Sequence, residues 1–334
     1  MLKALKIALA GVAALVGLVF LTAFVVVFLG DPEFPGPLKV SPEAMAAFTA
    51  SLQQPYPAAS RRFRMRDGTV LASQYFPRSS PSPSATTILL VHGVLASSFP
   101  LNRSSGLLRE ATGAEVVAID LRGHGASGGV PGDVRYIGQY EDDLGEVVAQ
   151  IRATKTGGRV ILAGHSMGGG IALRYALKKG LPPVDGYLLF APHLGDKSPT
   201  TPVKATKESA NFVQLDLSRT LGLLLFNSVG ITAFNGLQTL FFNLPKEMPL
   251  RSYSYRAMMG MSPEDYRPAL RAIHQPILFL AGSADEAFHA EYYEAAVRPF
   301  TNGGVVIVQG AGHDGVLNDP RTLAAVAAWL APAQ

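Results

Sequence analysis

The sequence predicts an α/β fold with a mostly parallel sheet, helices on both faces, an inserted helical cap and an N-terminal transmembrane helix. Strand-like and helical segments alternate from residue 86 to residue 190, which is the order of a parallel sheet with crossover helices. The alternation stops at Ala191 and resumes near Pro276. Such an interval is too long for a loop inside a compact domain, so it predicts an inserted cap. An apolar run over residues 7–29 is long enough to cross a bilayer.

Hydrophobic periodicity and turn residues place the individual elements. A helix is expected at 42–51, followed by a hairpin from Arg61 to Tyr75 that turns at Asp67-Gly68. Strands of the parallel sheet are expected at 86–91, 115–120, 159–163, 186–190, 277–282 and 304–308. Helices are expected at 103–112, 139–153, 168–179, 287–297 and 320–330.

These elements group into five segments. They are an N-terminal transmembrane signal-anchor helix (1–30), a linker (31–60), the first part of the core (61–192), the helical cap (193–270) and the second part of the core (271–334). The cap contains two bulky apolar blocks, 221–226 and 237–242, interrupted by Gly230, Gly236 and Pro245. No second membrane span is therefore expected. Two interpretations stay open, since the blocks either pack the cap on the core or form an apolar lid for an acyl chain.

The N-terminus predicts a membrane anchor. Lys3 and Lys6 precede the apolar run, and Asp31 and Glu33 follow it, which places the N-terminus inside and the rest of the chain on the extracytoplasmic side. The run exceeds the 7–15 residues of a signal-peptide core, and no small-residue cleavage site precedes Asp31. Secretion after signal cleavage remains the alternative.

Composition excludes several function classes. A net charge of +4 over 334 residues leaves no basic footprint for nucleic acid. The chain has no cysteine, hence no disulfide and no thiolate metal site. No ligand cluster, phosphate loop or obligate protein partner is evident, so no metal and no cofactor are predicted.

Gly164-His165-Ser166-Met167-Gly168 is the most informative motif. It matches G-x-S-x-G between a predicted strand and a predicted helix, the context of a nucleophile elbow. Glycines relieve the crowding of this tight turn, and the Ser166 hydroxyl projects from the sheet. Ser166 is the expected nucleophile.

Several further motifs occur in a characteristic order, and together they carry a family resemblance. They are His92-Gly93, 120–129 (Asp-Leu-Arg-Gly-His-Gly-Ala-Ser-Gly-Gly), 164–169, Gly282-Ser283-Ala284-Asp285 and Gly310-Ala311-Gly312-His313. From about Arg61 to its end, the chain resembles the α/β-hydrolase superfamily, and more narrowly the monoacylglycerol lipase and lysophospholipase-like serine hydrolases. The N-terminal span and the cap carry no motif of this resemblance.

A serine hydroxyl needs a base, and a carboxylate must hold that base in place. His313 lies in a glycine-flanked turn after the last strand, at the edge where the elbow opens, and is the expected base. Asp285 ends a strand between Ser166 and His313, as the order Ser, Asp, His requires. Glu286 and Asp314 are its rivals for the acid.

Six other histidines compete with His313. Three of them lie in the family signature loops and are expected to brace backbone, and the other three stand alone: His92, His124 and His165, then His193, His274 and His289.

Two backbone amides are expected to form the oxyanion hole. The Met167 amide begins the helix after the elbow, where amides lack intrahelical partners. The Val94 amide follows His92-Gly93 in the loop after the first parallel strand.

These residues predict a serine hydrolase that cleaves carboxylic esters through an acyl-enzyme. The resemblance implies a lipid-like ester as substrate, such as a monoacylglycerol or a lysophospholipid. A thioesterase, a peptidase or a C–C bond hydrolase would use the same triad and stays open. A catalytically silent binding protein on this fold is the alternative from another class.

Overall fold

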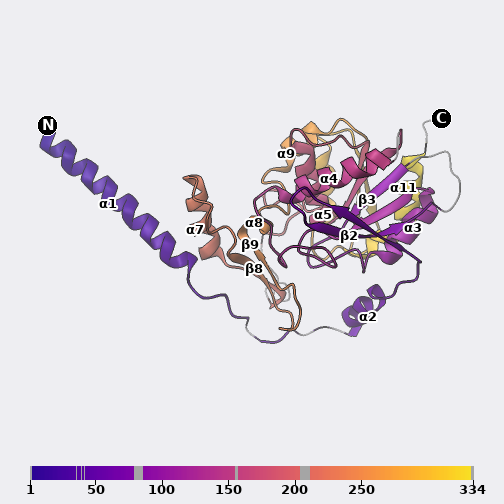
Figure 1. The fold of residues 1–334 in the computed structure, drawn as a ribbon, viewed down its shortest axis with the longest axis horizontal. Helices are drawn as coiled ribbons and strands as arrows, with labels where there is room; N and C mark the ends of the chain where they lie inside the picture. Colours follow the sequence, from indigo (N-terminus) through magenta and orange to yellow (C-terminus); the bar gives the residue numbers. More distant parts are fainter. Residues whose placement is uncertain are drawn as a thin grey trace. The chain divides into compact units, whose positions relative to one another are not determined.

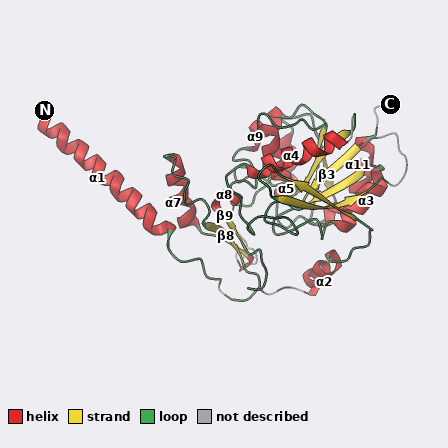
Figure 2. Cartoon of the chain, viewed as in Figure 1, coloured by secondary structure: helices red, strands yellow, loops and turns green. Residues whose placement is uncertain are grey.

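The computed structural model describes residues 2–34, 36–38, 40, 42–78, 86–154, 157–203 and 211–331. The chain divides into two compact units, each formed by two stretches of sequence. The core unit comprises Val40–Lys204 and Met259–Gln334, and the cap unit comprises Met1–Lys39 and Ala205–Met258. Figure 1 gives the course of the chain, and Figure 2 its helices and strands.

An eight-stranded sheet forms the centre of the core unit, in the order β1-β2-β4-β3-β5-β6-β10-β11. Its strands are β1 (Ala59–Arg64), β2 (Val70–Phe76), β3 (Thr86–Val91), β4 (Glu115–Ile119), β5 (Arg159–His165), β6 (Gly186–Phe190), β10 (Ile277–Gly282) and β11 (Gly304–Val308). The six strands from β4 to β11 along this order run parallel, while β1 and β2 form the expected antiparallel hairpin. The predicted mostly parallel sheet is therefore confirmed.

Helices cover both faces of this sheet, as Figure 2 shows. α3 (Asn102–Thr112) and α11 (Pro320–Leu330) pack together on one face. On the other face α5 (Met167–Leu177) contacts both α4 (Gln139–Thr154) and α9 (Tyr266–Ala272). The helix expected at 287–297 is partly wrong, since helical structure begins only at Ala290, with a 3₁₀ turn (Ala290–Tyr292) and the short α10 (Tyr293–Val297). Residues 287–289 are not helical, and the Asp285 carboxylate accepts the Ala287 and Phe288 amides there.

Local signals account for the helix ends. The Asp319 carboxylate accepts the Arg321 amide before α11, and Pro320 occupies the first turn, where its missing N–H has no intrahelical acceptor to lose. Gly113 ends α3 with φ of +68°, a left-handed conformation that glycine adopts at low cost. α2 forms at Pro42–Ser51, as predicted.

The cap unit combines helices with a small sheet. α7 (Leu217–Ser228) contains the apolar block 221–226, which is helical as expected. The second block, 237–242, is not helical: most of it is β8 (Gln238–Phe242), between β7 (Val213–Leu215) and β9 (Ser252–Ser254) in an antiparallel sheet. Thr239, Phe241 and Phe242 favour a strand once neighbours pair on both sides, and a six-residue apolar run cannot reveal this by periodicity. The short α8 (Tyr255–Met258) completes the unit.

α1 (Leu2–Val27) is the longest helix. Among the described residues, Leu9–Val27 is the stretch long and apolar enough to cross a membrane, a test that a signal sequence also passes. Only 12% of this stretch is buried inside the protein.

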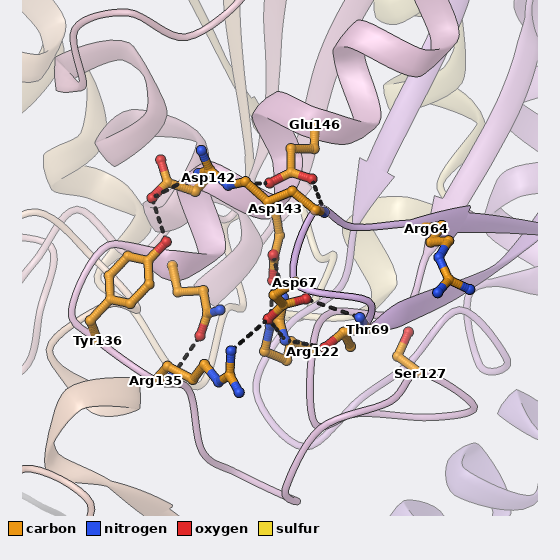
Figure 3. A network of polar contacts seen from close by, with 12 residues as sticks. Arg64, Asp67, Thr69, Arg122, Ser127, Arg135, Tyr136, Asp142, Asp143 and Glu146 are labelled. Carbon is orange, nitrogen blue, oxygen red and sulfur yellow. Dashed lines mark hydrogen bonds and ion pairs between the residues drawn. The ribbon is translucent and has the colours of Figure 1, made fainter.

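A buried arginine joins the hairpin turn of the core unit to helix α4 (Figure 3). Arg122 donates two hydrogen bonds to the Asp143 carboxylate, of 2.7 and 2.8 Å, and others to Asp67 and Thr69. Although burial opposes ionisation of Asp67, bonds from Thr69 and Arg122 hold its pKa at about 2. Arg122 is only 4% exposed and the Asp143 side chain 3%, so these two charges compensate each other inside the protein.

We expect Arg122→Met to destabilise the core unit by about 3–5 kcal/mol, because it leaves the Asp143 carboxylate buried without its cation. Thermal unfolding of the full chain in detergent measures this loss. Arg298→Met is the control, since Arg298 forms a surface pair with Glu294 and its side chain is 76% exposed. Equal unfolding temperatures for the two variants would contradict the structural role of Arg122.

Candidate active site

Ser166 occupies a sharp turn between β5 and α5. Its backbone has φ of +53° and ψ of −117°, a strained conformation for a residue with a side chain. The turn is possible only because Gly164 and Gly168 have no side chain. A Cβ at Gly164 would collide with the backbone of Gly168, and a Cβ at Gly168 would collide with the Val91 carbonyl. Ser166 is 8% exposed. The predicted strand, turn and helix context of the motif is therefore present.

His313 and Asp285 are in direct contact. His313 Nδ1 lies 3.0 Å from both carboxylate oxygens of Asp285, whose side chain is fully buried. Asp285 Oδ1 also accepts the backbone amides of Ala287 and Phe288 at 2.8 and 2.9 Å. These bonds orient the carboxylate, and they leave Nε2 as the ring nitrogen of His313 that can serve as a base.

The electrostatics of the pair favour a basic imidazole. Burial alone would lower the pKa of His313, but the hydrogen bond and negative charge of Asp285 outweigh it, and the pKa is raised above its usual 6.5. An imidazole of this kind accepts a proton more readily than a free one.

His165 braces backbone, as expected, and its partner is the loop that contains His313. Its Nε2 lies 3.1 Å from the His313 carbonyl, and the two rings are 4.7 Å apart. Burial, with the neighbouring His313 charge, lowers the pKa of His165 to about 4. A neutral His165 with its proton on Nε2 thus donates to that carbonyl at pH 7. Among the described residues, no hydrogen bond joins Ser166 Oγ to His313, and such bonds are often long before substrate binds.

The two rival carboxylates occupy different places. Glu286 Oε2 accepts the backbone amide of His313 at 2.9 Å, so it supports the loop rather than the imidazole. The Asp314 side chain is 88% exposed and lies 3.6 Å from His165 Nε2. Of the three acids, Asp285 is the one that contacts the His313 ring.

The loop after β3 approaches the serine closely. A Cβ at Gly93 would lie 3.2 Å from Ser166 Cβ, so a glycine allows this approach. Val94 and Leu95 form a turn that the Ala96 amide closes on the Gly93 carbonyl, and Leu95 has φ of +60°. Met167 is the first residue of α5, whose opening amides have no intrahelical acceptor.

Two histidines brace the neighbouring loops, as expected. His92 Nε2 accepts the Leu121 amide at 3.1 Å, and its Nδ1 is 2.7 Å from the Gly93 carbonyl. His124 Nδ1 lies 2.9 Å from the Arg122 carbonyl. Burial lowers the pKa of His92 to about 4 and that of His124 to about 3, so both rings are neutral at pH 7.

Among the described residues, one group of side chains has a spacing that invites comparison with a metal site. Ligand atoms of His165, His313 and Asp314 lie within 4.8 Å of one another. Nitrogen ligands of tetrahedral zinc stand only about 3.3 Å apart, because each bond is about 2.0–2.1 Å long. His313 Nδ1 already binds Asp285, and His165 Nε2 lies beside a carbonyl. The arrangement therefore fits a hydrogen-bonded cluster better than a metal site.

Several known proteins are similar to this chain. A model of the alpha/beta hydrolase family matches residues 88–327. The chain is 28% identical over 208 residues to the AB hydrolase superfamily protein YisY of Bacillus subtilis (strain 168), which covers 60% of this chain and 75% of that protein. It is 32% identical over 95 residues, 28% of each chain, to the sn-1-specific diacylglycerol lipase ABHD11 of Danio rerio.

The fold is also similar to that of a soluble variant of monoglyceride lipase from Saccharomyces cerevisiae, solved in complex with a substrate analog. The TM-score is 0.57 at 18% identity, over 83% of this chain and 98% of that chain. At this identity the likeness establishes the fold.

Proposed function

Because this chain belongs to the alpha/beta hydrolase family, we propose that it is a serine hydrolase that cleaves carboxylic esters through an acyl-enzyme. Ser166 is the nucleophile, His313 the base and Asp285 the acid that orients the base. The observation that carries this proposal is the paired contact between His313 Nδ1 and the buried Asp285 carboxylate, both distances being 3.0 Å. A carboxylate in that position selects the tautomer that leaves Nε2 free to take the serine proton.

In the acylation step, His313 Nε2 removes the proton from Ser166 Oγ as the oxygen attacks the ester carbonyl. The carbonyl oxygen becomes an oxyanion that accepts hydrogen bonds from the Met167 and Val94 amides. When the intermediate collapses, the bond to the alcohol oxygen breaks and His313 gives its proton to that oxygen. The acyl group remains on Ser166.

In the deacylation step, water takes the place of the alcohol. His313 removes a proton from the water, whose oxygen attacks the acyl carbonyl, and then returns the proton to Ser166 Oγ. The carboxylic acid leaves. Asp285 stays ionised throughout and stabilises the imidazolium that forms in each step.

We propose lipid-like esters, such as monoacylglycerols or lysophospholipids, as the substrates. The names of the diacylglycerol lipase and monoglyceride lipase relatives support this class. The apolar surface of the cap unit supports it as well, since Leu217, Leu221 and Leu224 are each at least half exposed.

A substrate panel tests the function. The full chain in detergent is offered p-nitrophenyl esters of increasing acyl length, monoacylglycerol, lysophospholipid, an acyl thioester and a peptide amide. We expect esters to be hydrolysed, the long-chain ones with the highest kcat/KM, and a fluorophosphonate probe to label Ser166. If the chain hydrolyses the thioester or the amide faster than the esters, it is a thioesterase or a peptidase and the proposed ester hydrolysis is wrong. The absence of both hydrolysis and labelling would indicate a silent binding protein.

We further propose that α1 is a retained membrane anchor that places the rest of the chain on the extracytoplasmic side. Lys3 and Lys6 before the span support this orientation. The full chain is expected in the membrane pellet after carbonate extraction, and protease added to intact spheroplasts should degrade the core unit. Protection of the intact chain would contradict the orientation. A soluble chain that begins near Asp31 would instead indicate secretion after cleavage.

A further inference from the structure

Within the cap unit, a buried arginine binds the end of α1. Arg219 is 5% exposed. Its guanidinium donates to the carbonyls of Val27 and Leu29, at 3.0 and 2.5 Å, and to the Asp31 carboxylate at 2.9 Å. Asp216 adds a second carboxylate oxygen at 3.4 Å. A cation here stabilises the carbonyl end of the α1 dipole, and its own charge is compensated inside the protein.

α7 then runs back alongside α1 in the antiparallel direction. Gly222, three residues after Arg219, packs against Ala23 and Val27, where a Cβ would lie 2.6 Å from Val27 Cγ2. The Phe226 ring, one turn further, stacks on Phe20 at 6.2 Å. Small residues of this kind allow close helix contacts inside membranes. Because each residue of a helix adds about 1.5 Å and Phe20 precedes the end of α1 by seven residues, Phe226 lies about 10 Å back from that end.

The opposite face of α7 is apolar and exposed. Leu217, Leu221 and Leu224 recur at positions i, i+4 and i+7, which lie on one stripe of a helix, and they are 59%, 55% and 50% exposed. Val229 and Ile231, just past the helix, are 55% and 40% exposed. Leucines of α1 are exposed as well, among them Leu15, Leu18 and Leu21 at 60% or more.

The polar side chains of α7 find partners within the cap unit. Ser218 donates to Asp216, Thr220 to the Asp216 carbonyl, Asn227 to Asn235 and to the Leu223 carbonyl, and Ser228 to the Leu225 carbonyl. Asn235 returns a bond to Asn227 Oδ1 at 2.9 Å. A helix surrounded by lipid needs such internal satisfaction, because hydrocarbon offers no hydrogen-bond partner.

We propose that α7 is a membrane-dipping helix that lies against α1 and presents its leucine stripe to the acyl chains of the bilayer. This inference rests on the membrane anchor proposed above. Arg219 and Asp31 mark the headgroup level, and the segment from Leu224 to Ile231 enters deepest. With 12 residues, or about 18 Å, α7 is too short to span a hydrocarbon core of about 30 Å. The N-terminal helix is thus a structural partner of the cap as well as an anchor.

Spin labels can test this directly, because the chain has no cysteine. Single variants Leu217→Cys, Leu221→Cys and Leu224→Cys of the full chain are labelled and reconstituted in phosphatidylcholine vesicles. Leu18→Cys on α1 is the lipid reference, and Lys179→Cys on the core unit is the water reference. Collision with oxygen reports exposure to lipid, and collision with a water-soluble nickel chelate reports exposure to water.

We expect the α7 labels to resemble the Leu18 label, with severalfold lower nickel accessibility than at Lys179 and a further decrease from Leu217 to Leu224. If the label at Leu18 is exposed to lipid but the labels at Leu221 and Leu224 are exposed to water, the membrane-dipping helix is refuted and the proposed anchor is supported. If Leu18 also reads as water, both are wrong. Labels shielded from both reagents would mean that protein covers the stripe, which also overturns the proposal. Ester hydrolysis by the same variants is independent of these outcomes.

A cross-link tests the α1 contact separately. The variant with both Val27→Cys and Gly222→Cys should form a disulfide on mild oxidation. A Cβ at Gly222 would lie 2.6 Å from Val27 Cγ2, an atom bonded directly to Val27 Cβ, and a disulfide needs two Cβ atoms about 3.5–4.5 Å apart. The resulting loop changes the electrophoretic mobility of the unreduced chain. Leu18→Cys with Gly222→Cys is the matched control and should not cross-link. Equal cross-linking of both pairs, or of neither, would refute the docked arrangement.

Discussion

Ser166→Ala is expected to lower kcat by at least about 10³, because the variant lacks the oxygen that becomes acylated. Folding should be unchanged, since the Ser166 side chain forms no hydrogen bond among the described residues and alanine leaves the turn backbone intact. Hydrolysis of the best ester of the panel, measured alongside thermal unfolding, checks both statements.

Ser105→Ala provides the matched control. Ser105 is a fully buried serine of α3 in the same unit, and its hydroxyl has no partner among the described residues. This variant also loses one buried serine hydroxyl, but away from the candidate site, and it should keep wild-type activity. Near-wild-type hydrolysis by Ser166→Ala would show that another group is the nucleophile.

Asp285→Asn is expected to lower kcat by about 10³–10⁴, because an amide favours the wrong tautomer of His313 and does not stabilise the imidazolium. Asp314→Asn should remain active, since that side chain is exposed and lies near His165 instead. The two purified variants are compared on one ester at saturating concentration. The opposite ranking would mean that Asp314 is the acid.

The contact between His313 and Asp285 also predicts how kcat/KM depends on pH. The base must be neutral to accept the serine proton, so activity falls as the pH drops through the pKa of His313. Since that pKa is raised above 6.5, the acidic limb of kcat/KM should lie above pH 6.5. In Asp285→Asn the limb should move to lower pH, because the stabilising charge is gone while burial remains. A limb that does not move would assign it to another group.

Local sequence was sufficient for most of the core unit, because its signals act over a few residues. The strands at Thr86–Val91, Ile277–Gly282 and Gly304–Val308 lie at their predicted residues, since each is a short apolar run bounded by turn residues. The elbow around Ser166 was predictable for a similar reason: close approach of Gly164 and Gly168 leaves room only for glycine. The order of Ser166, Asp285 and His313 along the chain was enough to predict the candidate triad.

The remaining features depend on contacts between residues far apart in sequence. Glu286 supports His313 across 27 residues, and His165 reaches the His313 carbonyl across 148. Neither pairing leaves a periodic pattern in the sequence. The apolar block 237–242 became a strand because β7 and β9 pair with it. An isolated apolar run favours helix and strand nearly equally until such partners decide.

The sequence by itself therefore determined the parallel sheet, the turn that holds Ser166 and the apolar length of α1, because backbone sterics and side-chain periodicity act locally. The tertiary structure alone showed which of the three carboxylates contacts the His313 ring. It also showed that Arg219 donates hydrogen bonds to the carbonyls at the end of α1. A carboxylate or guanidinium can be buried only where specific partners compensate its charge. Those partners are brought together by the folded chain, across 28 residues for His313 with Asp285 and 188 for Arg219 with Asp31.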